Sequence, residues 1–89
     1  MLIALIARDK PGALQTRLDN RDAHIAYLKS TGVVSQAGPL LDDDGGMIGS
    51  LVILEVKDMQ AARDWAENDP YAKAGLFSGV ELIPWKKVI

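Results

Sequence analysis

The run Leu2–Ala7, LIALIA, is apolar at every position, and this feature constrains the fold more than any other in the chain. Successive side chains of a β-strand point to opposite faces of a sheet, so a strand here has no polar face. The stretch Met47–Val56 is likewise mostly apolar on both sides. An antiparallel sheet with one face in water instead alternates apolar and polar residues. The sequence therefore predicts a sheet in which both faces need to be covered.

The rest of the pattern predicts two helices and two more strands. A helix is expected over residues 13–31, because four apolar side chains lie within about 80° of one another at 100° per residue. These side chains are Leu14, Leu18, Ile25 and Leu28. A second helix is expected from a cap at Asp58 to about Asn68, with strands over 33–41 and 76–85. The order βαββαβ predicts a single α+β domain over residues 1–89 with a ferredoxin-like fold, a four-stranded antiparallel sheet carrying two helices on one face.

Two helices can cover only one face of that sheet. The other apolar face needs a partner, and a second copy of the chain is the simplest one. We therefore expect a homodimer packed sheet to sheet, with a cleft at the edge. The alternative is a monomer in which the helices and the C-terminal tail wrap further around the sheet.

Composition excludes several classes of function. The 89 residues carry a net charge of -2, which argues against a nucleic-acid partner because such partners select a basic surface. The chain has no cysteine and one histidine, so neither a thiolate nucleophile nor a self-contained zinc site is expected, and no cofactor is predicted. No stretch approaches the roughly 20 apolar residues of a membrane span, so we expect no membrane partner and a cytoplasmic location.

One side of the first helix carries residues suited to chemistry. Arg17, Arg21 and His24 are spaced i, i+4 and i+7, which aligns them along one side of a helix. Guanidinium groups hold carboxylates and phosphates, and an imidazole transfers protons near neutral pH. This side is a candidate site for a small anionic molecule. The alternative is structural, with the arginines paired to Asp19 or Asp22 and the histidine packed and hydrogen-bonded.

The segment NDPYAKAGLF, between the second helix and the last strand, adds an acid. Asp69 can cap a short helical turn that begins with Pro70, and this role needs no chemistry. If the carboxylate also reached His24, it would fix the tautomer of the imidazole and raise the basicity of the other ring nitrogen. Pro39 and Ser50 are further candidates, because Gly38-Pro39 kinks a strand and Ser50 is a hydroxyl among apolar neighbours.

Several segments together resemble the YciI-like (YCII-related) family of small ferredoxin-like proteins. The matching segments are ARDKPGALQTRL, Arg21–Ile25, Gln36–Leu40, Gly49-Ser50, DPYAKAGLF and Pro84–Val88. The resemblance implies a dimeric α+β barrel with a cleft that holds a catalytic His and Asp. Carried over by position, these are His24 and Asp69, with Asp9 as a second acid that could pair with the histidine. Arg17, Arg21, Ser50, Pro39 and Tyr71 lie in matching segments and are the expected substrate-binding residues.

Three functions remain open at this point. The first is a small cofactor-independent enzyme in which His24 and Asp69 perform acid/base isomerisation, elimination or hydrolysis of a small organic anion. The second is a binding module without chemistry, because DKPGAL resembles the loop before the first helix of amino-acid-sensing ACT domains. In that hypothesis Pro11 and Gly12 bring helix N-terminal amides to a ligand carboxylate. The third is a scaffold subunit whose uncovered sheet face binds a different protein.

Overall fold

The computed structural model describes all 89 residues. The chain forms four strands and three helices, and every predicted strand and helix is present, with no end displaced by more than two residues. The elements are β1 Leu2–Asp9, α1 Leu14–Thr31, β2 Val34–Leu41, β3 Met47–Glu55, α2 Met59–Asn68, α3 Pro70–Lys73 and β4 Phe77–Trp85. The short α3 is the helical turn expected after Asp69.

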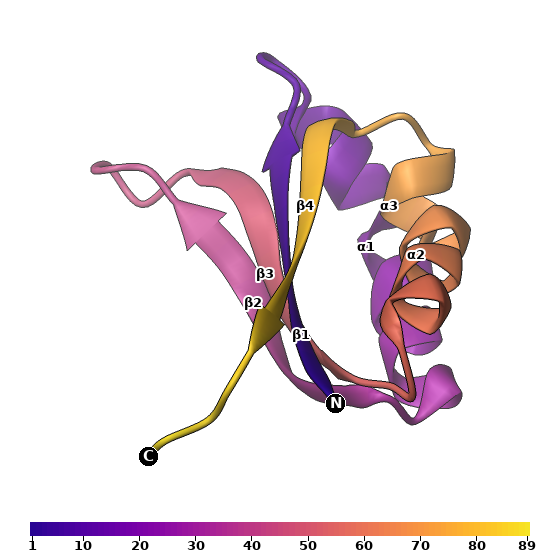
Figure 1. Ribbon diagram of the computed structural model, residues 1–89. Helices are drawn as coiled ribbons and strands as arrows, with labels where there is room; N and C mark the ends of the chain where they lie inside the picture. Colours follow the sequence, from indigo (N-terminus) through magenta and orange to yellow (C-terminus); the bar gives the residue numbers. More distant parts are fainter.

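The strands form one antiparallel sheet in the order β2-β3-β1-β4. The two most apolar strands, β1 and β3, therefore occupy the centre, where both edges are hydrogen-bonded to neighbouring strands. Figure 1 shows all three helices on one side of the sheet and none on the other. This is the predicted ferredoxin-like α+β arrangement.

The core lies between the sheet and the helices. Ile3 and Leu5 of β1 and Val52 and Leu54 of β3 point toward the helices and are at most 2 % exposed. Trp65 of α2 packs against them from the helix layer. Each such apolar side chain contributes about 1.5–3 kcal/mol by leaving water, so this cluster holds the two layers together.

Hydrogen bonds fix α2 at its start and against α1. The Asp58 carboxylate accepts the backbone N–H of Ala61, which satisfies one of the amides that a helix leaves unpaired at its N-terminus. The Tyr27 hydroxyl donates to the Trp65 carbonyl at 2.9 Å, and the Trp65 indole donates to Thr31 Oγ1 at 3.0 Å. The C-terminal half of α1 and the middle of α2 are thereby held side by side.

The buried side of α1 only partly matches the apolar pattern: Ile25 and Leu28 are half-buried and Leu28 packs against the core, but Leu14 and Leu18 do not. Leu14 is 50 % exposed and Leu18 is 46 % exposed, whereas the buried residues of α1 are Arg17 and His24. Polar side chains can be buried where hydrogen-bond partners meet them, and β1, β3 and the corner before α3 supply those partners. The helix is therefore rotated toward its polar side, which brings its charged groups into the interior.

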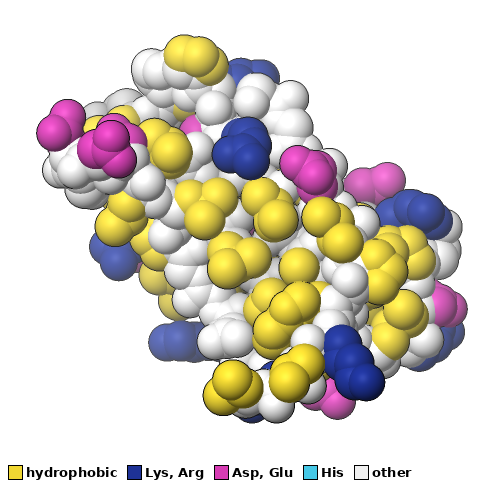
Figure 2. Space-filling view, turned by 60° about the vertical axis from the view of Figure 1, so that its left-hand side comes forward, with side chains coloured by type: hydrophobic (Ala, Val, Ile, Leu, Met, Phe, Trp, Pro, Cys, Tyr) yellow, Lys and Arg dark blue, Asp and Glu magenta, His cyan; other side chains and the backbone are white.

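The face of the sheet away from the helices is apolar, as predicted. Leu51, Ile83 and Trp85 project from it and are 38 %, 44 % and 39 % exposed. In Figure 2, which brings the left side of Figure 1 forward, hydrophobic side chains gather in a broad patch and most charged side chains lie at its margins. None of the helices is long and apolar enough to cross a membrane.

Candidate active site

The corner between α2 and α3 positions Asp69. Its backbone ends α2, and its side chain caps α3, in which Pro70 occupies the favoured first turn. The carboxylate oxygen Oδ1 accepts the backbone N–H of Tyr71 at 3.0 Å. The same oxygen lies 2.8 Å from Nδ1 of His24, which projects from the middle of α1. Asp69 is 2 % exposed, so the cap and the contact with the imidazole both lie in the interior.

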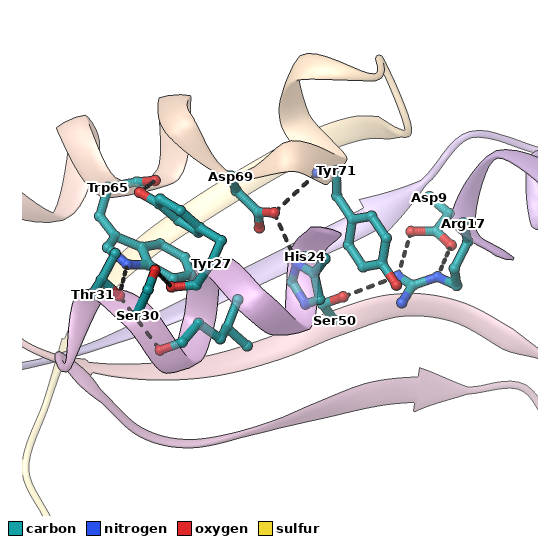
Figure 3. A network of polar contacts seen from close by, with 11 residues as sticks. Asp9, Arg17, His24, Tyr27, Ser30, Thr31, Ser50, Trp65, Asp69 and Tyr71 are labelled. Atoms are coloured by element: carbon teal, nitrogen blue, oxygen red, sulfur yellow. Dashed lines mark hydrogen bonds and ion pairs between the residues drawn. The ribbon is translucent and has the colours of Figure 1, made fainter. Parts of the chain in front are cut away.

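The contact with Asp69 determines the tautomer of His24. A carboxylate only accepts hydrogen bonds, so the proton of the contact resides on Nδ1 and the neutral imidazole keeps Nε2 as an acceptor. Nε2 has no partner in the chain, and no buried polar side-chain atom is left unpaired. Nε2 therefore reaches solvent. His24 presents a basic nitrogen on one side and is held by an acid on the other (Figure 3).

Tyr71 holds the imidazole ring from one face. The two ring centroids are 3.8 Å apart and the rings are inclined by 13°, which is a stacked arrangement. Phe77 packs edge-on against Tyr71 with centroids 6.1 Å apart. With its ring stacked and Nδ1 hydrogen-bonded, His24 has little freedom to rotate, so the direction of Nε2 is set before a ligand arrives.

A second polar cluster lies beside Tyr71. Arg17 Nε and Nη2 donate to the two carboxylate oxygens of Asp9 at 2.7 and 2.8 Å, a planar two-bond pairing typical of arginine with an acid. Nη2 also donates to Ser50 Oγ at 2.9 Å. Burial lowers the pKa of Arg17, but the hydrogen bonds and charges of Asp9 and Tyr71 together raise it by more, so the guanidinium stays charged.

A pocket of about 200 Å³ opens between α1 and the strands β2 and β3. Ile25 and Leu28 of α1 form one apolar wall, and Ala37, Met47 and Val52 belong to the opposite one. The polar residues lie together, so the lining is apolar with a few convergent polar groups, as is usual for small-molecule sites. Those residues are Arg17, Arg21, His24, Ser50 and Tyr71.

The polar lining contains groups with unused hydrogen-bonding capacity. Arg17 Nη1 has no partner in the chain and, like His24 Nε2, cannot be buried, because no buried polar side-chain atom is unpaired. The Tyr71 hydroxyl lies beside the Arg17 guanidinium, which can donate a hydrogen bond to it but cannot accept one, so the hydroxyl proton stays available to a ligand. Burial raises the pKa of Tyr71, while the charges of Arg17 and Arg21 oppose the rise, so its phenol stays protonated at neutral pH. Arg21 is exposed and forms no ion pair, so it places an uncompensated positive charge at the rim.

A family model for the YCII-related domain matches residues 1–86. The chain belongs to this family. YciI of Escherichia coli is 40% identical over 97 aligned residues, covering 99% of both chains, and an uncharacterized protein of Haemophilus influenzae is 39% identical over the same span. The predicted family membership is thus confirmed over nearly the full chain.

A solved structure of a similar protein is known with a ligand. It is the 5-chloro-2-hydroxyhydroquinone dehydrochlorinase TftG of Burkholderia phenoliruptrix, in complex with 2,5-dihydroxybenzoquinone. It is 39% identical with a TM-score of 0.88, covering 97% of this chain and 94% of that one. Two less similar structures share the fold. Rv0793 of Mycobacterium tuberculosis has a TM-score of 0.65 and 15% identity, with full coverage of both chains. An antibiotic biosynthesis monooxygenase has a TM-score of 0.58 and 14% identity, covering 98% of this chain and 100% of that one.

The site of this YCII-related chain contains most of the residues that the sequence suggested. Six of them line the pocket, namely Arg17, Arg21, His24, Pro39, Ser50 and Tyr71. Asp69 stands behind His24, outside the lining. Of the two acids considered as partners of the histidine, Asp69 contacts it, whereas Asp9 is occupied by Arg17.

Two features of the site escaped sequence reasoning. The stacking of Tyr71 on His24 has no sequence signal, because 46 intervening positions separate two residues from different elements. The ion pair between Arg17 and Asp9 could have been suspected, since both lie in one matching segment.

Pro11 and Gly12, expected to bind a carboxylate in an ACT-like module, lie outside the pocket. No group of three or more His, Cys, Asp or Glu side chains is arranged to hold a metal.

Proposed function

We propose that the chain is a small enzyme that performs acid/base chemistry on a single-ring, oxygen-bearing organic molecule. The observation that carries this proposal is the double role of the imidazole, in which Nδ1 of His24 contacts Asp69 at 2.8 Å while Nε2 is free and the residue lines a pocket. A base held in one tautomer beside a small, partly apolar hollow is the arrangement that proton abstraction needs.

In the proposed mechanism His24 Nε2 removes a proton from the substrate. The imidazolium that forms is stabilised by the carboxylate of Asp69, to which Nδ1 continues to donate. The proton then returns to another atom of the substrate, which gives isomerisation, or a leaving group departs with its electron pair, which gives elimination. Neither route consumes an oxidant or reductant, so the reaction requires no redox cofactor. Arg21 at the rim attracts an anionic substrate.

The size of the pocket supports a substrate with one ring. A cavity of about 150 Å³ is large enough for benzene, and the pocket here measures about 200 Å³. The apolar walls suit the faces of a ring, while the polar groups gathered on one side suit its oxygens. The similar dehydrochlorinase, solved with a dihydroxylated benzoquinone, supports the same substrate class.

Chloride release from 5-chloro-2-hydroxyhydroquinone tests the proposal. We expect the wild-type chain to release chloride and His24→Gln to do so about 10²–10⁴-fold more slowly, because the amide cannot accept the proton. Asp22→Asn, an exposed change elsewhere on α1, is the matched control and should leave the rate unchanged. A His24→Gln variant that keeps the full rate would overturn the acid/base role, and a wild-type chain that releases no chloride would exclude dehydrochlorination.

We also propose that the functional unit is a homodimer packed sheet to sheet. The apolar face carrying Leu51, Ile83 and Trp85 lacks any cover within the chain, and an exposed apolar area of this kind is typical of a protein interface. Sedimentation equilibrium of the wild type should give twice the mass of one chain, and Leu51→Glu should shift the equilibrium to the monomer. A wild-type monomer at all concentrations would contradict the proposal.

A further inference from the structure

The hydroxyl of Ser50 is a hydrogen-bond donor with a fixed direction. Its oxygen accepts a hydrogen bond from Arg17 Nη2 at 2.9 Å, and Arg17 cannot rotate away because Asp9 holds two of its nitrogens. A guanidinium never accepts a hydrogen bond, so the hydroxyl proton of Ser50 points away from Arg17. Ser50 is 3 % exposed and lines the pocket, which leaves the pocket as the place where a ligand can receive that proton.

Tyr71 supplies a second donor on the same side. Its ring is held between His24 and Phe77, and Arg17 lies 4.8 Å from the ring centroid, so the hydroxyl cannot swing away from the cluster. The Arg17 guanidinium beside it can only donate to the hydroxyl oxygen, so the hydroxyl proton is not used within the chain. Because burial raises the pKa of Tyr71, its hydroxyl keeps a proton to donate. Figure 3 shows the Tyr71 hydroxyl, the Arg17 guanidinium and Ser50 together on one side of the imidazole.

The negative charge of Asp9 affects which ligand group these donors bind best. The charge of Arg17 is compensated by a carboxylate at 2.7 Å, so this end of the pocket has many donors and little net charge. A cluster of fixed donors with little net charge suits a single carbonyl or phenol oxygen on which negative charge develops, as in an oxyanion hole. The unpaired positive charge belongs to Arg21 at the rim, so the two arginines serve different parts of a ligand.

We propose that the Ser50 and Tyr71 hydroxyls, together with Arg17 Nη1, form an oxyanion site that binds the ring oxygen of a phenol or enol and stabilises it as an anion. This inference rests on the proposed function and names its substrate class, cyclic compounds that interconvert keto and enol forms. When His24 Nε2 takes a proton from the carbon beside a ring carbonyl, the C–H electron pair becomes a C=C bond. The carbonyl π pair moves to oxygen, where the hydroxyls stabilise it. Collapse of the anion returns the proton to another carbon or expels a leaving group.

Binding of 4-nitrophenol tests the oxyanion site without turnover. Its phenolate absorbs visible light and its phenol does not, so a titration in the presence of the protein reports the pKa of the bound phenol. We expect the wild type to bind the phenolate more tightly than the phenol and to lower that pKa. Removal of one donor by Ser50→Ala or Tyr71→Phe should weaken phenolate binding roughly 10- to 100-fold.

Matched controls separate this effect from loss of structure. Ser78→Ala removes a hydroxyl that is bonded to the Arg8 carbonyl on the surface, and Tyr27→Phe removes a hydroxyl that is bonded to the Trp65 carbonyl. Both lie outside the pocket, and both variants should bind the phenolate as the wild type does. If Tyr71→Phe fails to fold, Ser50→Ala alone decides.

Three results would overturn the inference: no binding of 4-nitrophenol by the wild type, equal affinity for its two forms, or unchanged phenolate binding in Ser50→Ala. The outcome for the acid/base proposal is separate. His24→Gln should lose turnover but retain the preference for phenolate, because the donors remain. If the wild type showed no preference for phenolate over phenol but its turnover still depended on His24, the oxyanion site alone would be rejected. Retention of turnover in His24→Gln would reject the base alone.

Discussion

Nδ1 of His24 lies 2.8 Å from Oδ1 of Asp69, although 45 positions separate the two residues in the chain. The distance is that of a strong charge-assisted hydrogen bond. Its direction matters for chemistry, because it leaves Nε2 free to accept a proton. The same carboxylate oxygen caps α3 through the backbone of Tyr71, whose ring stacks on the imidazole. One acidic residue thus organises a turn, a ring orientation and a tautomer.

Asp69→Asn should separate the chemical role of this acid from its structural one. Asparagine caps helices about as well as aspartate, so the midpoint of thermal unfolding should change little. The asparagine Oδ1 can keep both the cap and the contact with Nδ1, but the neutral amide does not stabilise the imidazolium that forms when Nε2 takes a proton. We expect kcat to fall about 10²–10⁴-fold for any substrate that the wild type converts. Asp58→Asn, at the cap of α2, is the control, and an Asp69→Asn enzyme with normal kcat would show that the charge of Asp69 is irrelevant to catalysis.

Arg17 and Asp9 should be strongly coupled in stability. Their side chains are only 4% and 6% exposed, so Arg17→Met leaves a buried carboxylate without its cation and should destabilise the fold by about 3–5 kcal/mol. The double variant Arg17→Met/Asp9→Leu removes both charges. Its free energy of unfolding, measured with urea, should exceed that expected from adding the single effects by about 0.5–3 kcal/mol. Additive effects would mean that the interaction between Arg17 and Asp9 contributes nothing to the free energy of unfolding. Arg63→Met, on the exposed side of α2, is the surface control.

The two tyrosines should make stability fall at high pH. Burial raises the pKa of Tyr71 and of Tyr27 above the ordinary value of about 10. Between the unfolded and folded pKa the native chain holds more protons than the unfolded chain, so the free energy of unfolding decreases as pH rises. The stabilisation is complete below pH about 10 and is lost as the pH passes the folded pKa.

The Tyr27→Phe/Tyr71→Phe double variant isolates this contribution, because the chain has no other tyrosine. Urea unfolding between pH about 8 and about 12 should show a shallower decline for the double variant than for the wild type. The lysines titrate in the same range in both proteins, so the difference between the two curves is the tyrosine contribution. Parallel curves would contradict the raised pKa values.

Gly49→Ala should damage the sheet beside the site. A Cβ at position 49 would overlap the Ala7 carbonyl oxygen of the neighbouring strand β1, which would force the backbones apart. We expect a loss of about 1–3 kcal/mol in the free energy of unfolding and weaker ligand binding, since Ser50 is the next residue. Gly79→Ala in β4 is the matched control, because a Cβ there meets nothing within 4 Å. Equal stability of the two variants would show that the strand can yield.

The sequence by itself determined the element order and the two-faced character of the sheet. These are local properties: the apolar run Leu2–Ala7, the cap at Asp58 and the Asp69-Pro70 turn are each specified by neighbouring residues, and all three behave as predicted. Most of the candidate site residues also lie around one pocket, and they fall in segments that resemble one family, whose match holds over residues 1–86.

Only the tertiary structure decided which side of α1 is buried and which acid meets which base. The apolar pattern favoured the side with Leu14, Leu18, Ile25 and Leu28, of which only the last two are half-buried, whereas the fully buried residues of α1 are Arg17 and His24. A helical pattern depends only on the apolar side chains of the helix itself, and it contains no information about hydrogen-bond partners on distant strands and turns. Once Asp9, Ser50 and Asp69 satisfy these polar groups, burying them is no longer prohibitive. Pairings across the fold therefore depend on where the sheet brings partners together, and that information lies in no single segment of the chain.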